Sequence, residues 1–229
     1  MRLRVSYLLI LISLTPPCLL TQETADTLLK KHVQAMGGMD RIKTILSARC
    51  TANVWFNGLE GHVIWAEKWP SSSLREVHWP NGNVRLLSTD SPERSDLPEK
   101  LRLPTEEVFG ELVAYSFGFG PENKVEYLGQ RDEEGAVAQV IILHRPDGRL
   151  TSYYLDPTTF LPFKIILEDP KDPLPTVVYL GGWYYNGDIA FHRREDHYRN
   201  GQLFESLTKL EYVLNPPIDD GTFARELSK

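Results

Sequence analysis

The segment ARCTANVWFNGLEGHVIWAEKW, residues 48–69, decides the fold. Before Asn57-Gly58, small and apolar side chains recur at every second position, which is typical of a strand with one buried face. Asn and Gly tolerate the positive φ angles that a tight hairpin turn requires. The segment therefore predicts two antiparallel strands, over residues 48–56 and 60–69, joined by a turn.

The same alternation and the same kinds of turn continue along most of the chain. Further strands are predicted over residues 74–80, 84–89, 124–131, 136–145, 149–155, 162–168, 176–185, 188–199 and 202–213. Their expected turns are Asn81-Gly82, Pro146-Asp147-Gly148, Asn186-Gly187 and Asn200-Gly201. About eleven strands joined mostly by hairpins predict a mainly β (α+β) fold with one large, strongly twisted antiparallel sheet. Residues 169–175 are predicted to be a loop that is too short to separate domains, so residues 22–229 are expected to form a single domain.

Two helical segments are predicted before the first strand. Over residues 24–37 the apolar positions recur at steps of three and four, and Gly37-Gly38 can end a helix in a left-handed conformation. The apolar stripe consists of Ala25, Leu28, Leu29, His32, Val33 and Met36. Because His32 lies on this stripe, it is interpreted as a packed core histidine rather than a ligand. A short turn over residues 40–46 is expected to lead into the first strand.

A third helix is predicted within the meander, over residues 105–115. Thr105 can cap it, and the glutamates that follow suit the positive end of a helix dipole. One face would carry the apolar residues Val108, Phe109, Leu112 and Val113. A loop rich in proline and charge, residues 91–104, precedes this helix. We expect the helix to lie as a lid on the open apolar face or at the mouth of the sheet.

The first residues differ in kind from the rest of the chain. Two arginines lie within residues 1–4, and residues 5–14 form an almost unbroken apolar run. Such a run is too short to cross a bilayer core, which needs about 20 residues, so residues 1–21 are interpreted as a secretory signal peptide. No second long apolar run follows, so no integral membrane span is expected.

Cys18 leaves two alternatives for the mature N-terminus. A lipoprotein would be acylated at such a cysteine, whereas Pro16 and Pro17 stand where small residues usually precede it. The other alternative is ordinary cleavage between Cys18 and Ala25. The expected location is the periplasm in both cases, with an outer-membrane lipid anchor if Cys18 is acylated.

The net charge and the cysteines limit the kinds of partner. The formal charge is −6, and it becomes −8 if the positive charges of Arg2 and Arg4 are removed with the signal peptide. A net acidic protein is a poor electrostatic partner for nucleic acid or anionic lipid headgroups. Cys50 is then the remaining cysteine, so no internal disulfide is expected. Its position in an alternating strand indicates a small buried apolar side chain.

The chain lacks the sequence signatures of several enzyme classes. It has no G-x-S-x-G, no H-E-x-x-H, no G-x-x-x-x-G-K and no G-x-G-x-x-G that opens a helix after a strand. We therefore expect no catalytic residues, no cofactor and no metal.

The densest polar cluster is HRREDH, residues 192–197, within a predicted strand. Alternation would place His192, Arg194 and Asp196 on one face and Arg193, Glu195 and His197 on the other. Each triplet contains an arginine, which makes a poor metal-binding set. Cross-strand charge pairs on a solvated sheet face are the favoured interpretation, and a metal or acid–base site is the alternative.

Aromatic side chains of the predicted strands form either ordinary core or part of a ligand-binding surface. Trp65 and Trp79 are expected on the same faces as Val63 and Val77. If the inward aromatic surface exceeds what one helix can cover, an apolar cavity remains, and barrel mouths bind lipids in such cavities. The predicted ligand-binding residues are Trp65, Trp79, Val108, Phe109, Leu112 and Val113.

Four segments, in this order, resemble those of one family. They are AMGGMDRIK at residues 35–43, YLDPTTFLP at 154–162, GDIAFH at 187–192 and NPPIDDGTF at 215–223. Together they are similar to bacterial outer-membrane lipoprotein-sorting proteins of the LolA/LolB type, and specifically to their uncharacterised periplasmic relatives. The resemblance covers nearly the whole chain after the signal peptide, although His192 stands where such relatives usually carry a proline.

The resemblance implies an unclosed half-barrel, in which an antiparallel sheet wraps around helices that act as a lid over an apolar cavity. It also implies a non-catalytic protein that binds or carries acyl chains of lipoproteins, or another hydrophobic ligand, in the periplasm. The cargo-releasing arginine of such carriers does not align with any one residue of this chain. The alternative function is a structural or interaction module of the envelope, with or without a lipid anchor, that binds a protein partner through its sheet edge or concave face.

Overall fold

The computed structural model describes residues 24–68, 72–88, 116 and 122–223. Three predicted features lie outside the described residues. They are the signal peptide with Cys18, the loop over residues 91–104, and the lid helix with Val108, Phe109, Leu112 and Val113. Within the described ranges, no helix is long and apolar enough to cross a membrane.

Eleven strands form one antiparallel sheet, as the alternating pattern predicts. They are β1 (Ser47–Phe56), β2 (Leu59–Lys68), β3 (Ser72–Trp79), β4 (Gly82–Ser88), β5 (Lys124–Glu133), β6 (Ala136–His144), β7 (Leu150–Leu155), β8 (Pro162–Asp169), β9 (Asp172–Gly181), β12 (Arg194–Arg199) and β13 (Gln202–Leu214). The strand order across the sheet is β4-β3-β2-β1-β13-β12-β9-β8-β7-β6-β5. The first and last strands of the chain are therefore neighbours inside the sheet.

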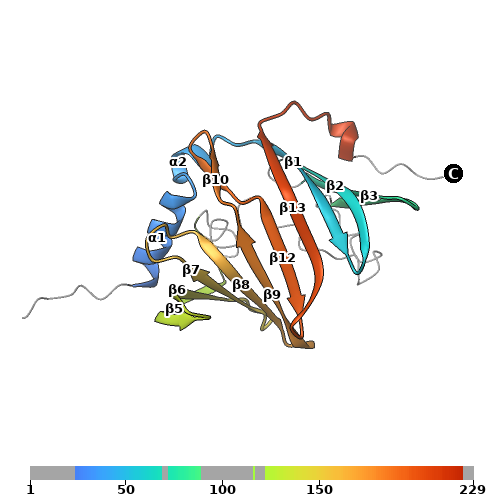
Figure 1. Cartoon of the computed structure of the whole chain (residues 1–229). Coiled ribbons are helices and arrows are strands. Elements are labelled where there is room, and N and C mark those ends of the chain that lie inside the picture. The colour runs from blue at the N-terminus through green and yellow to red at the C-terminus, as the bar shows by residue number, and fades with distance from the viewer. Residues whose placement is uncertain (1–23, 69–71, 89–115, 117–121, 224–229) are drawn as a thin grey trace, which may run out of the picture.

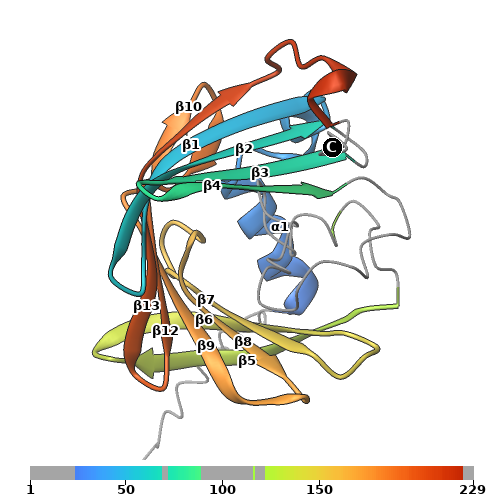
Figure 2. The same cartoon turned by 90° about the vertical axis from the view of Figure 1, so that its right-hand side faces the viewer.

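The sheet is not closed, because β4 and β5 lie at its opposite edges. It curves strongly around helix α1 (Ala25–Ala35), which lies on its concave side (Figures 1 and 2). This arrangement confirms the expected half-barrel. The term concave face is used below for the side of the sheet that faces α1.

Two hairpins turn where Asn-Gly predicts a turn. Asn57 and Gly58 have φ angles of 46° and 90°, and Asn200 and Gly201 have φ angles of 50° and 71°. Two successive positive φ angles are typical of the type I′ turn, whose twist matches that of the flanking strands. The β3–β4 turn is one position earlier than predicted, at residues 80–81.

The predicted loop over residues 169–175 is wrong, because β9 already begins at Asp172. Pro173 and Pro175 made this segment look irregular, since proline has no amide to donate within a sheet. The pairing of β9 with β12 starts at Thr176, so both prolines lie in a part of β9 that extends beyond β12. Proline is tolerated where one side of a strand is unpaired.

Helix α1 begins and ends as the sequence predicts. Its N-cap is Thr24, whose Oγ1 accepts a hydrogen bond from the amide of Thr27 at 3.2 Å. At the other end Gly38 N–H donates to Val33 O at 2.9 Å, and Gly37 N–H donates to Gln34 O at 3.1 Å. These two bonds form a Schellman motif, which satisfies carbonyls that the helix leaves unpaired. The short helix α2 (Met39–Ile42) follows directly.

Helix α1 fills the half of the concave face formed by β5 to β8. Leu28 and Leu29 pack into an apolar cluster with Ile141, Leu143, Tyr153 and Leu155. His32 is also buried, and its Nδ1 lies 2.9 Å from Phe160 O. Burial lowers the pKa of His32 to about 4, so the ring is neutral at physiological pH. The interpretation of His32 as a core histidine is confirmed.

The predicted strands over residues 176–185 and 188–199 are wrong, because each is interrupted. β9 ends at Gly181, and Gly182, with a φ of 68°, turns the chain away from the sheet. The chain then forms a separate hairpin of β10 (Tyr184–Asn186) and β11 (Ile189–Phe191) before β12 resumes the sheet. Ala190 N–H donates to Met36 O at 3.2 Å, so this hairpin is tied to the C-terminal end of α1.

A second apolar cluster joins the β10–β11 hairpin to β1, β2, β3 and β13. Its buried members are Met36, Ile42, Cys50, Ala52, Val54, Val63, Val77, Leu161, Ile189, Ala190, Phe191, Leu207, Leu210 and Tyr212. On the opposite, convex side of the sheet, Phe223 of the short helix η3 (Asp220–Phe223) packs against Ala66 and Leu74. The β10–β11 hairpin therefore packs on the concave side, whereas η3 packs on the convex side.

Candidate ligand-binding face

The concave face of β1, β2 and β3 is lined by small and apolar side chains. Cys50, on β1, lies opposite Trp65 on β2. The neighbouring positions Val63 and Val77 are cross-strand partners on β2 and β3, and both are buried. Cross-strand partners share one face of a sheet, so these residues form a continuous surface. Helix α1 packs on the other half of the sheet, around β6 and β7.

Cys50 contributes to this surface as an apolar group. Its side chain is 2% exposed, and burial raises the pKa of the thiol to about 12. A thiol with a raised pKa is a poor nucleophile, because the thiolate is the reactive form. The prediction of a small buried side chain at Cys50 is confirmed.

Trp65 and Trp79 are the described members of the predicted ligand-binding set, and both are partly buried against the second cluster. Gly61 makes room for Trp79. A Cβ atom at Gly61 would lie 2.8 Å from a ring carbon of Trp79 and 2.6 Å from His78 O. The sequence thus brings both indoles to one face, but contact of either with a ligand stays a prediction.

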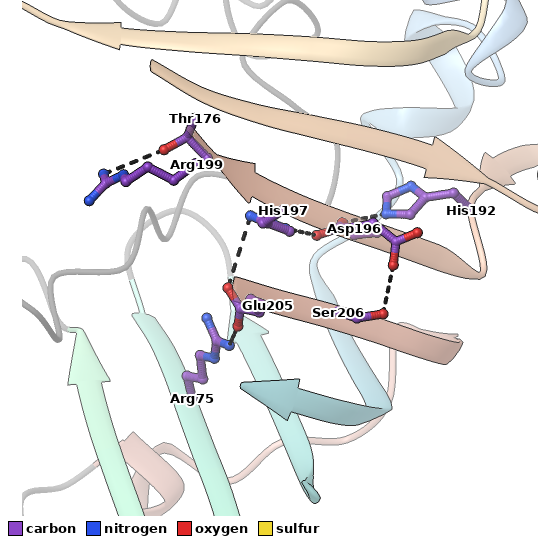
Figure 3. Close-up of polar contacts among 9 residues, drawn as sticks. Arg75, Thr176, His192, Asp196, His197, Arg199, Glu205 and Ser206 are labelled. Carbon is purple, nitrogen blue, oxygen red and sulfur yellow. Dashed lines mark hydrogen bonds and ion pairs between the residues drawn. The ribbon is translucent and has the colours of Figure 1, made fainter. Parts of the chain in front are cut away.

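Charged residues lie on the same concave face, where the strong curvature of the sheet brings side chains of strands that are not neighbours together. Arg75, on β3, lies beside Trp65 in the β2–β3 register. Its Nη2 is 2.8 Å from Glu205 Oε1 on β13, although β2 and β1 lie between these strands in the sheet. The side chains of Arg75 and Glu205 are only 11% and 5% exposed. The ion pair therefore spans the concave side and joins two parts of the sheet that are not neighbours (Figure 3).

A chain of ionisable groups continues from Glu205 towards the β10–β11 hairpin. His197 Nδ1 lies 3.9 Å from Glu205 Oε2, and its Nε2 lies 3.1 Å from Glu195 Oε2. The other oxygen of Glu195 is paired with Nε2 of His192, which directly follows β11. Arg75, Glu205, His197, Glu195 and His192 are called the polar chain below; Figure 3 labels all of them except Glu195.

Two members of the polar chain, Glu195 and His197, have shifted pKa values. Burial by itself would raise the pKa of Glu195, but the charges and hydrogen bonds of His192 and His197 lower it well below its usual range. Burial by itself would lower the pKa of His197, but its hydrogen bond to Glu195 and the charges of Glu195 and Glu205 raise it. The structure therefore favours an ionised Glu195 beside a protonated His197.

We expect the polar chain to give the protein a pH-dependent stability that His197 controls. Because the pKa of His197 is raised above its ordinary value of 6.5, its contribution is complete below pH 6.5 and is lost as the pH rises through the raised pKa. Because the pKa of Glu195 is lowered from 4.5, its contribution is complete above pH 4.5 and is lost as the pH falls through the lowered pKa. Both contributions are complete between pH 4.5 and pH 6.5.

Thermal midpoints measured between about pH 6 and pH 9 test this expectation. The decrease with rising pH should be smaller in His197→Gln than in the parent protein. His144→Gln is the matched control, because His144 forms a partly exposed pair with Glu126 at a distance of 2.9 Å. Equal pH dependence in the parent and in His197→Gln would contradict the proposed role of His197.

The prediction for residues 192–197 is wrong in two respects. His192 precedes β12 and is not part of a continuous strand, so it reaches Glu195 instead of pointing to the opposite face. Glu195 and His197 lie on the concave face and are largely buried, so this side is not a solvated sheet face. The pair of Arg194 and Asp196, at 2.7 Å, and the bond from Ser206 to Asp196, at 2.6 Å, lie on the other face.

The polar chain does not resemble a metal site. Glu195 lies between His192 and His197 and pairs one carboxylate oxygen with each ring. In the part of the chain that the structure describes, no group of three or more His, Cys, Asp or Glu side chains could hold a metal ion. A surface hollow of about 240 Å³ lies elsewhere, between hairpin tips that include Gly148, Pro170 and Pro173. Its lining contains no member of the concave face.

Comparisons with known proteins show the fold. No family model matches the sequence, and no curated protein matches it. A putative outer membrane lipoprotein-sorting protein domain from Vibrio parahaemolyticus superposes with a TM-score of 0.58 and 10% identity, over 87% of this chain and 97% of the other. A LolA superfamily protein from Nitrosomonas europaea gives a TM-score of 0.57 and 13% identity, over 89% and 99%. The chain has the LolA-like fold.

A DUF1329 family protein from Desulfovibrio piger shares this fold, with a TM-score of 0.56 and 10% identity, over 88% of this chain and 98% of the other. The LolA-like fold accounts for the order of the elements, from α1 through the unclosed sheet. At identities of 10 to 13%, the similarity establishes the architecture and no shared activity.

Proposed function

We propose that this protein is a non-catalytic periplasmic binding or carrier protein for acyl chains of lipoproteins, or for another hydrophobic ligand. The ligand lies against the concave face of β1, β2 and β3. The proposal rests on a difference between the two halves of the concave face. Helix α1 packs against the β5–β8 half. The other half carries the apolar row around Trp65 and Val63, with Trp79 beside it, and there the β10–β11 hairpin packs against the sheet.

The LolA-like fold supports this proposal, because two of the similar structures are described as lipoprotein-sorting or LolA superfamily proteins. An apolar concave surface with a few polar groups is the usual composition of a small-molecule site. The polar chain supplies such groups at one side of the apolar row. The signal-like N-terminus supports export to the periplasm, and Cys18 is a candidate lipid anchor.

The lid belongs to the same proposal. Residues 89–123 connect β4 to β5, which are the two opposite edges of the sheet. The predicted helix over residues 105–115 lies in this connection and carries Val108, Phe109, Leu112 and Val113 on one side. These four residues, together with Trp65 and Trp79, are the proposed ligand contacts.

The double variant Phe109→Ser/Leu112→Ser tests the lid and the ligand together. Loss of two large apolar contacts of about 1.5–3 kcal/mol each is expected to weaken binding of a fluorescent fatty-acid probe by at least about tenfold. The far-ultraviolet circular dichroism of the sheet should remain unchanged. The control is Val137→Ser/Leu174→Ser, because both side chains are 44% exposed. A parent protein that binds no probe would contradict the carrier function.

A protein partner is the second candidate, and the free edges of the sheet favour it. Within the described residues β4 and β5 each pair with one strand, so the outer side of each can accept an added strand from a partner. Native mass spectrometry of the protein purified from its own envelope separates the two candidates. A carrier should retain copurified lipid, whereas an interaction module should retain a protein and no lipid.

A further inference from the structure

In the part of the chain that the structure describes, the Nε–H of Arg75 is a buried donor without an acceptor. The Nη2 of the same side chain is already engaged, since it donates to Glu205 Oε1 at 2.8 Å. Buried polar atoms are almost always paired, and one that is not usually marks a place where a water, an ion or a ligand binds.

The surroundings of this donor hold it in a fixed position. The guanidinium carbon of Arg75 lies over the ring of Trp65, 5.0 Å from its centroid, which is a cation–π contact. The ion pair with Glu205 fixes the opposite side of the group. Nε is therefore held beside an apolar aromatic surface. A single hydrogen-bond donor within such a surface is expected where a site binds one polar atom of a largely apolar ligand.

We propose that Arg75 Nε donates a hydrogen bond to the carbonyl oxygen of an ester or amide in the bound ligand, so that the concave face selects uncharged acyl esters or amides over ionised fatty acids. This inference rests on the proposed carrier function and defines the chemical class of its ligand. Arg75 is a binding residue in this scheme, and no covalent step is involved.

The charge balance around Arg75 argues for an uncharged acceptor. Glu205 already neutralises the guanidinium, so an ionised carboxylate from the ligand would add an unpaired negative charge to a buried site. Glu67 lies two residues beyond Trp65 on the same strand face and is partly buried. Burial raises the pKa of Glu67 to about 7, so a negative charge without a cationic partner is disfavoured at that position. A carbonyl oxygen accepts the hydrogen bond without adding charge.

The inference is tested with three probes of equal chain length: pyrenyl-dodecane, pyrenyl-dodecanoic acid and its methyl ester. Binding to the full chain is measured by pyrene fluorescence at about pH 8, where the free acid is ionised. In the parent protein the ester is expected to bind about tenfold or more tightly than the acid, because the acid must leave an unpaired charge in the site.

Two variants of Arg75 remove the Nε donor in different ways. Arg75→Met/Glu205→Met replaces the whole ion pair by apolar groups, so no unpaired charge is left. Arg75→Lys keeps a cation for Glu205 but has no nitrogen at the Nε position. In both variants the ratio of ester affinity to hydrocarbon affinity should fall about tenfold, while the hydrocarbon affinity stays the same. The matched control is Arg149→Met/Asp147→Met, an exposed pair at a hairpin turn with a distance of 2.6 Å.

The outcomes separate this inference from the carrier function. An unchanged ester-to-hydrocarbon ratio in the folded variants, or an acid that binds the parent as tightly as its ester, overturns the role of Arg75 and leaves the carrier function standing. Failure of all three probes to bind the parent protein overturns both. Thermal midpoints identify a variant that does not fold, and Arg75→Lys, which retains the ion pair, then decides the question.

Discussion

Replacing Gly37 with alanine is expected to lower the free energy of unfolding by about 3 kcal/mol. The φ angle of Gly37 is 125°, which side chains other than hydrogen rarely allow. A Cβ atom there would lie 2.7 Å from the backbone oxygen of Asp188 and 2.6 Å from Cδ1 of Ile189. The side chain of Ile189 can move, but the oxygen of Asp188 belongs to the β10–β11 turn and cannot move without the hairpin. Urea denaturation monitored by tryptophan fluorescence measures the loss.

Gly187→Ala is the matched control for this prediction. Gly187 also has a positive φ angle, 63°, but a Cβ atom there would meet nothing within 4 Å. Only the cost of a left-handed backbone applies, so the expected loss is about 1 kcal/mol. Equal losses at the two positions would show that the close approach between the end of α1 and the β10–β11 hairpin contributes little to stability.

Local patterns were sufficient to predict most of the sheet. Asn57-Gly58 and Asn200-Gly201 determine their own backbone angles, so the hairpins at these positions follow from two residues each. Alternating burial along β1, from Ala48 to Val54, follows the side-chain alternation of any strand with one covered face. The unclosed shape came from the resemblance to the LolA/LolB type, because alternation does not reveal whether a sheet closes.

The separate β10–β11 hairpin could not be predicted from the alternation of polar and apolar side chains. Its residues continue the period-two pattern of their neighbours, and Gly182 alone gives little indication that the chain leaves the sheet. The residues that hold this hairpin in place are distant from it in the sequence. Met36 O, at the end of α1, accepts the amide of Ala190, and the side chain of Asn186 donates to Tyr212 O at 2.8 Å. These partners become visible only after the fold brings them together.

Only part of the candidate site was predictable, because some of its contacts also join residues that are distant in the sequence. Trp65 follows from its strand position, whereas the ion pair of Arg75 and Glu205 joins residues separated by 130 positions and by two strands. The pair forms because the sheet bends between them. β13 contains a bulge at Lys209, with a φ of 56°, where its register with β1 shifts. Bulges increase the bend and twist of a strand, and no simple sequence signal marks this one.

Replacing Leu28 with alanine is expected to lower the free energy of unfolding by about 3–4 kcal/mol. Leu28 is fully buried and joins α1 to the strands around Ile141 and Tyr153. Truncation removes the apolar contacts and leaves a cavity that the sheet can only partly fill, because the surrounding strands are paired on both sides. Leu46→Ala is the control, since Leu46 is 66% exposed and should change the stability by less than about 0.5 kcal/mol.

Leu28→Ala also tests whether the part of the concave face that α1 covers is separate from the part where the ligand is proposed to bind. Leu28 packs against the β5–β8 half, whereas the proposed ligand lies on β1, β2 and β3 near Trp65. The folded variant should therefore bind the pyrenyl ester as tightly as the parent protein, despite its large loss of stability. A clear change in ester affinity at temperatures well below the thermal midpoint would show that the ligand extends beneath α1. The binding face would then include the strands that α1 covers, and the position of α1 would itself depend on the ligand.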